Sequence, residues 1–283
     1  MAIRFVIDSG SDILPAEAEK KGMVHVPLTV SFEGQEYLDA VELGHEEFYD
    51  KLESCENLPV TSQVPPYRFE EVFEKVVSEG DTVIAITISG ALSGTYQSAC
   101  IAAAEFPRKV FVVDSANVSL GMRILVERGL ELLKQGLAAE EIVEKLNEEK
   151  KRVRVLALLD TLEYLKKGGR ISSATAFAGG LLNIKPVVTV KDGLVEMAGK
   201  ARGSKAGNNL LRKLIQEGSG VDFKRPYFAA YSGKSDALLQ KYLKDSADLW
   251  QTEVQEMPFG TVGSVIGTHV GPNVVAVAFF EKE

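Results

Sequence analysis

One run of seven apolar or β-branched residues, residues 82–88 (TVIAITI), constrains the fold more than any other stretch of the chain. A strand without polar alternation is buried on both faces, which is typical of a parallel sheet covered by helices. The glycine-containing turn Ser89–Gly94 (SGALSG) follows directly, and a helical pattern then runs over residues 95–105. This order predicts a βαβ unit of an open α/β sheet.

The same alternation continues through the first part of the chain. Further β-branched runs at residues 3–7, 109–115 and 153–159 are separated by amphipathic helical patterns, the longest over residues 119–135. Strands that alternate with helices in this way predict a doubly wound layer. We therefore predict an α/β protein whose N-terminal domain, residues 1–160, has a mostly parallel sheet.

The pattern changes in the last third of the chain. Two strand-like runs, residues 185–190 and 194–199, flank Lys191-Asp192-Gly193, and an Asp-Gly pair favours a tight hairpin turn. A small-residue helix is expected at residues 173–182 (SATAFAGGLL), and further helices alternate with short strands up to the C-terminus. We predict a smaller C-terminal α+β domain with a mixed sheet, residues 161–283.

Composition excludes several classes of protein. A chain of 283 residues lies near the size at which single cores divide into domains. Its 40 acidic and 32 basic residues give a net charge of -8, which argues against nucleic acid as a partner. The longest apolar run, residues 274–280, is far too short to span a bilayer, and the N-terminus has no signal-peptide pattern. We expect a cytoplasmic protein without stable membrane insertion.

The turn Ser89–Gly94, which follows the buried strand at residues 82–88, is the leading candidate for a binding site. Ligands of open α/β sheets bind at such turns, where free backbone N–H groups and a helix start favour an anion. Ser93 adds a hydroxyl, although it could instead only cap the following helix. The dinucleotide, P-loop and nucleophile-elbow patterns are absent, the last because Ala91 and Thr95 stand where its glycines would be.

Three further candidates lie elsewhere in the chain. Thr61-Ser62-Gln63 precedes a proline-rich loop that would hold its hydroxyls in place, or it is an ordinary turn. Arg170, in the turn GGRIS, could pair with a ligand anion or hold two domains together. His269 is expected in an irregular glycine-rich loop beside the last strand, where a histidine is a reasonable ligand-binding candidate. No metal-binding spacing of His or Cys accompanies them.

Two charged segments have simpler interpretations. Asp8 and Asp12 follow the first strand and could suggest a phosphate-ester or magnesium site, but capping of the next helix is the favoured interpretation. Arg202 and Lys205 form a small basic patch, which is usually plain surface and could also dock an acidic partner.

Taken together, the sequence resembles the DegV family of bacterial fatty-acid-binding proteins. The resemblance rests on the order and spacing of six stretches rather than on any single motif, and it covers the whole chain. One departure is Val64, where the family usually has a proline. The stretches are FVIDSGSDI (5–13), TSQ (61–63), ISGALSGTYQSA (88–99), GGRIS (168–172), LLNIKP (181–186) and the closing segment around His269.

This resemblance implies that the protein holds a long-chain fatty acid, such as palmitate, between its two domains. It implies that the family's carboxylate-binding hydroxyls correspond to those of Thr61 and Ser93, and that the turn at Gly94 lies behind them. It also implies that Ser62, Arg170 and His269 line or support the head-group site.

The resemblance further implies a role as the lipid-presenting subunit of a fatty acid kinase. The separate kinase subunit would bring ATP and magnesium, so no catalytic residue, metal or cofactor is expected in this chain. Arg202 matches a family position implicated in contact with that kinase. The alternative is a serine esterase-like hydrolase with Ser93 as nucleophile and His269 as base.

Overall fold

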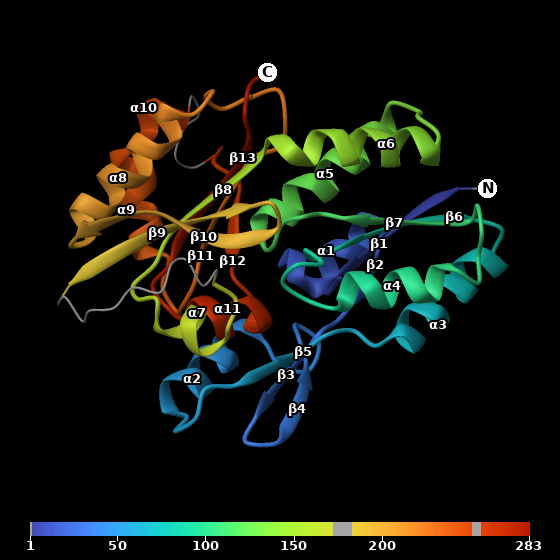
Figure 1. The fold of residues 1–283 in the computed structure, drawn as a ribbon, viewed down its shortest axis with the longest axis horizontal. Helices are drawn as coiled ribbons and strands as arrows, with labels where there is room; N and C mark the ends of the chain where they lie inside the picture. Colours follow the sequence, from blue (N-terminus) through green and yellow to red (C-terminus); the bar gives the residue numbers. More distant parts are fainter. Residues whose placement is uncertain (1, 172–182, 251–255) are drawn as a thin grey trace.

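The computed structural model describes residues 2–171, 183–250 and 256–283. Figure 1 shows two larger sheets side by side and a smaller sheet below them. The first sheet is entirely parallel, and one of its two inner strands is the apolar run singled out from the sequence. In spatial order its strands are β2 (Val24–Val26), β1 (Ile3–Asp8), β6 (Thr82–Thr87) and β7 (Val110–Asp114).

Helices cover both faces of this parallel sheet, as the unbroken burial of β6 requires. One pair of helices packs on each face (Figure 1), and a short helix follows β1. The pairs are α3 (Pro66–Ser78) with α4 (Thr95–Ala103) and α5 (Leu120–Lys134) with α6 (Ala139–Glu149); the short helix is α1 (Pro15–Lys20).

The second sheet has six strands and mixed direction. Only β11 and β12 pair in parallel, and the other neighbours are antiparallel. Helices α8 (Ser204–Glu217), α9 (Ala237–Asp245) and α10 (Ala247–Trp250) lie along its outer side (Figure 1). In spatial order the strands are β10 (Leu194–Arg202), β9 (Ile184–Lys191), β8 (Val153–Leu158), β13 (Val275–Phe280), β11 (Phe228–Tyr231) and β12 (Phe259–Thr261).

The predicted fold class is confirmed: the chain is α/β, with a parallel first sheet and a mixed second sheet. The hairpin of β9 and β10 closes around Asp192 and Gly193, as expected. Strand β8, which precedes the expected boundary at residue 160, pairs with β9 and β13 of the second sheet. The division at residue 160 stays a prediction, and the helix expected at residues 173–182 lies outside the described residues.

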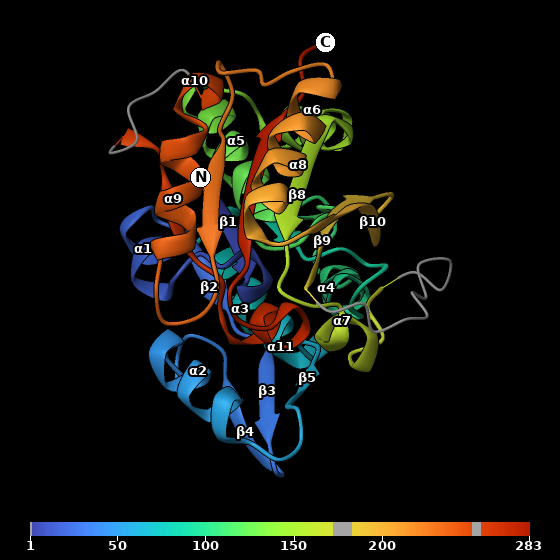
Figure 2. The same ribbon diagram turned by 90° about the vertical axis from the view of Figure 1, so that its left-hand side faces the viewer.

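A small third sheet with its own helix lies below the two larger sheets (Figure 2). Its strand β5 (Val60–Ser62) pairs with β3 (Thr29–Phe32), which forms a hairpin with β4 (Gln35–Leu38). Helix α2 (His45–Ser54) buries Phe48, Tyr49 and Leu52 in a separate cluster with Val30 and Leu43. We call this part, residues 28–64, the small-sheet unit.

Helix α5 joins the two large sheets because two glycines let it approach both. A β-carbon on Gly129 would lie 2.6 Å from Phe5 of β1, and one on Gly121 would lie 2.5 Å from Val155 of β8. Both distances are shorter than real contacts allow, so alanine at either position would push a sheet away. The first and second sheets therefore share one continuous apolar core.

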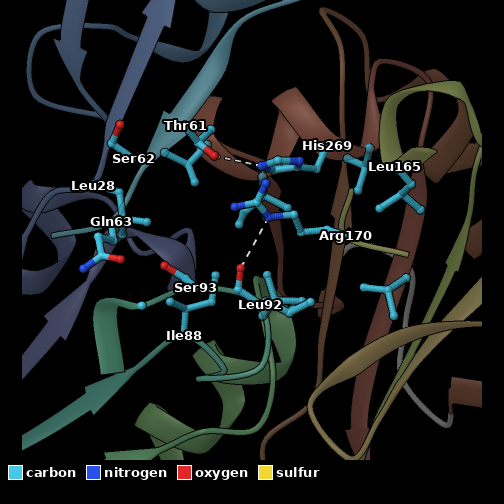
Figure 3. Close-up of a pocket in the computed structure, with 16 residues that line it drawn as sticks. Leu28, Thr61, Ser62, Gln63, Ile88, Leu92, Ser93, Leu165, Arg170 and His269 are labelled. Carbon is cyan, nitrogen blue, oxygen red and sulfur yellow. Dashed lines mark hydrogen bonds between the residues drawn. The ribbon is translucent and has the colours of Figure 1, made fainter. Parts of the chain in front are cut away.

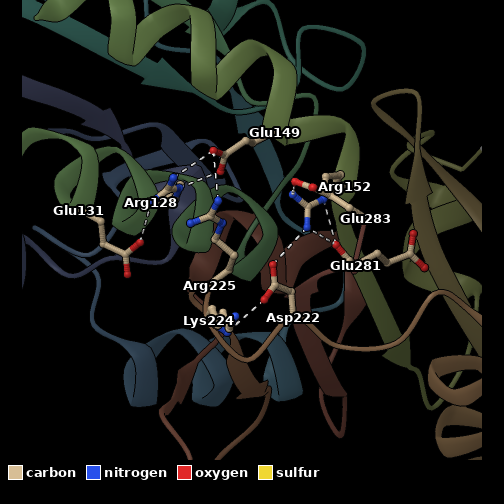
Figure 4. A network of polar contacts seen from close by, with 9 residues as sticks. All are labelled: Arg128, Glu131, Glu149, Arg152, Asp222, Lys224, Arg225, Glu281 and Glu283. Carbon is tan, nitrogen blue, oxygen red and sulfur yellow. Dashed lines mark hydrogen bonds and ion pairs between the residues drawn. The ribbon is translucent and has the colours of Figure 1, made fainter. Parts of the chain in front are cut away.

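A network of charged side chains connects α5 and α6 with the segment that precedes β11 (Figure 4). The guanidinium of Arg128 donates two hydrogen bonds to Glu149, at 2.7 and 3.0 Å. Arg225 approaches the same carboxylate at 3.7 Å, and Arg152 pairs with Asp222 at 3.1 Å. Buried ion pairs add little net stability, so we interpret this network as fixing how the layers meet.

Candidate functional site

A cavity of about 350 Å³ lies where the small-sheet unit, the first sheet and the second sheet meet. Its walls come from strand β5, the turn after β6, the segment after helix α7 (Glu163–Lys167) and helix α11 (Ser264–Val270). Figure 3 shows the polar side chains that line this cavity. All six ligand-binding residues expected from the sequence line it: Thr61, Ser62, Ser93, Gly94, Arg170 and His269.

The turn after β6 is held by its own hydrogen bonds. The N–H groups expected to be free for an anion are mostly occupied, because the turn folds back on Ser89, so this expectation is corrected. Ser93 Oγ lies 2.9 Å from Thr95 Oγ1 and accepts a hydrogen bond from Thr95 N–H at 3.3 Å. The occupied donors are Gly90 N–H to Asp114, Ala91 N–H to Ser89 Oγ, and Leu92 and Ser93 N–H to the Ser89 carbonyl.

Ser93 consequently has a local bond that resembles a cap, although the residue at the cap position of α4 is Gly94. The side chain is only partly buried and lines the cavity. Its hydroxyl is therefore both supported by Thr95 and open to a ligand.

His269 lies in helix α11 and not in an irregular loop, so this expectation was wrong. Gly271, at φ +72°, ends the helix one residue after Val270, which explains why the glycine-rich sequence suggested a loop. His269 Nε2 lies 2.9 Å from Thr61 Oγ1, and Nδ1 is buried without a partner among the described residues. Burial and then the nearby charge of Arg170 lower the pKa of His269 to about 4, so the ring is neutral near pH 7.

Arg170 reaches across the mouth of the cavity. Its Nη1 donates to the carbonyl of Gly168 at 2.7 Å, and its Nε donates to the carbonyl of Leu92 at 3.4 Å. The residue is exposed, so its charge lies at the solvent side of the cavity. The dashed lines in Figure 3 show how Thr61–His269 and Arg170–Leu92 close two sides of the mouth.

A second, mostly apolar chamber of about 60 Å³ lies beside the inner end of the cavity. Val118, Leu165 and Ile266, among others, line both. Its walls come largely from the inner face of the second sheet, through residues such as Val188 and Ala276. Sequence analysis did not identify these sheet residues as part of a binding site. The sheet residues were missed because every inward position of a buried strand has the same apolar pattern.

The remaining candidates lie away from this cavity. Arg202 is exposed at the end of β10. Asp8 is a buried carboxyl and Asp12 a partly buried one, and both accept hydrogen bonds, Asp8 from Gly10 and Ile88 N–H at 2.8 Å each. Burial raises the pKa of both to about 7. Among the described residues, no group of His, Cys, Asp or Glu could hold a metal ion.

The fold and the cavity define a class: an α/β ligand-binding protein whose cavity has a polar mouth and an apolar inner end. The particular family follows from the sequence, since the DegV family model matches residues 2–282. A DegV domain-containing protein of Deinococcus radiodurans is 35% identical over 98% of both chains. The chain belongs to the DegV family.

Solved structures of relatives have the same fold. A DegV family protein from Thermus thermophilus, described as fatty acid binding, is 37% identical, covers 100% of both chains and has a TM-score of 0.87. DegV of Bacillus subtilis, a fatty acid binding protein, is 30% identical with a TM-score of 0.83 over 100% of both chains. No described helix of the present chain is long and apolar enough to cross a membrane.

Proposed function

We propose that this protein binds a long-chain fatty acid, with the carboxylate at Thr61 and Ser93 and the acyl chain between the two large sheets. The observation that carries the proposal is the arrangement of the cavity, whose hydroxyls and imidazole lie beside an apolar chamber that shares part of its lining. An amphipathic ligand with one small polar end fits such a gradient. The fatty acid binding of the Thermus thermophilus and Bacillus subtilis relatives supports the same ligand class.

The chemistry of the mouth suits a carboxylate. A buried carboxylate must accept hydrogen bonds, and Thr61 and Ser93 can each donate one from a hydroxyl. Each methylene of the acyl chain that leaves water contributes about 0.8 kcal/mol, so a sixteen-carbon tail would supply most of the affinity. In this arrangement the hydroxyls orient the ligand and the apolar walls hold it.

We propose further that the bound fatty acid is presented to a separate kinase subunit in the cytoplasm, which converts it to an acyl phosphate. This part of the proposal rests on the family resemblance. Arg202 would contribute to the kinase contact, since it is exposed and lies outside the cavity lining. Arginine is among the residues that most often carry binding energy at interfaces.

The arrangement does not favour an esterase. His269 Nε2 is bonded to Thr61, and Ser93 is bonded to Thr95, so the bonds among these described residues do not join the proposed nucleophile and base. A serine hydrolase needs the nucleophile within hydrogen-bond reach of its base. Turnover of a reporter ester that is lost in Ser93→Ala would nevertheless restore the esterase hypothesis.

The binding proposal is tested by mass spectrometry of the purified, denatured protein. A long-chain fatty acid should be released, and delipidated protein should bind added palmitate. Absence of both results would refute the proposal.

The kinase role is tested separately with Arg202→Ala in a reconstituted kinase assay. Palmitate binding should be unchanged, because Arg202 is exposed and surface ion pairs contribute at most about 1 kcal/mol. Acyl phosphate formation should fall. Normal turnover in the variant would remove Arg202 from the kinase contact and leave the binding proposal intact.

A further inference from the structure

Two aspartates, the buried Asp39 and the partly buried Asp12, accept hydrogen bonds at the start of helix α11. Asp12 Oδ1 accepts a hydrogen bond from Gly263 N–H at 2.9 Å. Asp39 accepts one from Ser264 N–H at 3.1 Å and a second, short one from the Ser264 hydroxyl. These bonds satisfy backbone donors that a helix start leaves free, and they link residues more than 200 positions apart.

His45, at the start of α2, contacts Val262, the residue just before Gly263 and Ser264. Its Nδ1 lies 3.2 Å from the carbonyl of Val262, and its Nε2 lies 2.8 Å from the carbonyl of Gly233. A carbonyl only accepts hydrogen bonds, so the ring is the donor toward these two segments. Tyr49, one turn further along α2, also donates to the Val262 carbonyl, at 3.3 Å.

The contacts of Asp39 and His45 bear on the hydrogen bond between Thr61 and His269. Both belong to the small-sheet unit, which also carries Thr61 on strand β5. The helix that they hold carries His269 near its other end. The contacts therefore connect the two partners of the Thr61–His269 hydrogen bond through a second, independent route.

Helix α11 is well suited to transmit this constraint. It spans only Ser264–Val270, and it lies directly against α2. A β-carbon on Gly267 would lie 2.6 Å from the ring of Phe48 and 2.8 Å from the hydroxyl of Tyr49. A short helix packed this closely moves as one piece, so a displacement of its first turn also displaces His269.

We propose that Asp39 and His45 are positioning residues of the head-group site: by fixing Val262–Ser264 they set where α11 places His269 relative to Thr61. The inference deepens the proposed function, because it assumes that His269 and Thr61 face the ligand carboxylate. Burial raises the pKa of Asp39, which marks the carboxyl as a group that water does not reach. Burying a carboxyl group costs free energy, and a solvent-exposed residue could cap the helix without that cost.

The experiment uses two substitutions with matched controls. Ser264→Ala removes one bond to Asp39, and Ser246→Ala removes an equally buried serine hydroxyl near the C-terminal helices. His45→Gln disrupts the two carbonyl contacts, and His25→Gln changes a histidine on β2. Each full-length variant is checked for folding by thermal unfolding. The rings are observed by NMR with ¹⁵N-labelled histidine, which is simple because the chain has three histidines.

The ring signals of His269 in the ligand-free protein are the primary measurement. They should shift in Ser264→Ala and in His45→Gln and stay constant in both controls. Palmitate affinity should fall about tenfold in the first two variants, the change expected when about 1.4 kcal/mol is lost.

The possible results separate the two proposals. Unchanged His269 signals in both Ser264→Ala and His45→Gln would overturn the positioning role, whatever palmitate does. Shifted signals with wild-type affinity would overturn it as well, because the head group would then not sense the displacement. Shifted signals in a protein whose wild type binds no fatty acid would support the link between the small-sheet unit and α11 while refuting the proposed function.

Discussion

Replacing Thr61 with valine is the most direct test of the head-group geometry. Valine keeps the shape of the side chain and removes only the hydroxyl, whose oxygen lies 2.9 Å from His269 Nε2. In the ligand complex this substitution removes one of the donors available to the carboxylate. A hydrogen bond to a charged group is worth about 1.5–3 kcal/mol, so palmitate affinity should fall roughly tenfold to a hundredfold.

The fold should tolerate this change. Thr61 lies on a three-residue strand, its side chain is partly exposed, and its backbone pairing with Val30 is unaffected by the side chain. Substitutions at such positions alter stability by about 0.5 kcal/mol or less. Thr29→Val is a matched control, because Thr29 lies on the neighbouring strand β3 and does not line the cavity.

Isothermal titration calorimetry of delipidated proteins with palmitate measures the effect. A double-mutant cycle with His269→Gln then tests whether Thr61 and His269 act on the ligand together. Their effects should be non-additive, since the two side chains share one hydrogen bond. Wild-type affinity in Thr61→Val, or strict additivity in the cycle, would refute the reasoning that places the carboxylate beside this pair.

Three further predictions concern the pKa of His269, the pH dependence of stability and the space beside the His269 ring. In Arg170→Gln the pKa of His269 should rise only slightly above about 4, since burial, its larger cause, remains; ring NMR across pH measures this. Asp8 and Asp12 have pKa values raised from 3.8 to about 7, so their stabilising contribution is full below pH 3.8 and is lost as pH rises through 7. Denaturant unfolding of Asp12→Asn should therefore show a smaller decline than wild type between pH 4 and 7, and an equal decline would contradict this. Gly168→Ala should weaken palmitate binding measured by calorimetry, because its β-carbon would lie 2.2 Å from His269 Nδ1; unchanged affinity would contradict the crowding.

The parts of the fold that depend on local pattern could be predicted from the sequence. Residues 82–88 indicated a strand buried on both faces, and β6 is an inner strand of the parallel sheet with helices on each side. Asp192-Gly193 indicated the turn of the β9–β10 hairpin. In each case the residues that determine the element are neighbours in the sequence, so periodicity and turn chemistry were sufficient.

Features that depend on distant partners could not be predicted in this way. Strand β8 has the same apolar pattern as the strands of the first sheet, and only its pairing with β9 and β13 places it in the second. Helix α11 contains Gly267 and ends at Gly271, which locally favour a loop. Its helical form is supported by Asp39, which lies far away in the sequence. Local patterns had already singled out the segments of Thr61, Ser93, Arg170 and His269 as candidates, and family resemblance assigned them to one carboxylate site. The supporting residues leave no signal in a single sequence.

The charges around the mouth of the cavity offer a reason why a lipid-presenting protein would bind the carboxylate through hydroxyls. His269 is neutral near pH 7 because burial lowers its pKa, and Arg170 keeps its charge at the exposed rim. On the proposed function, the carboxylate is held by neutral donors, without a buried ion pair that would resist its release. A carboxylate bound in this way can give up a hydroxyl contact at modest cost when its oxygen attacks a phosphoryl group. The added phosphate charge would then lie toward Arg170 and solvent and would not be buried.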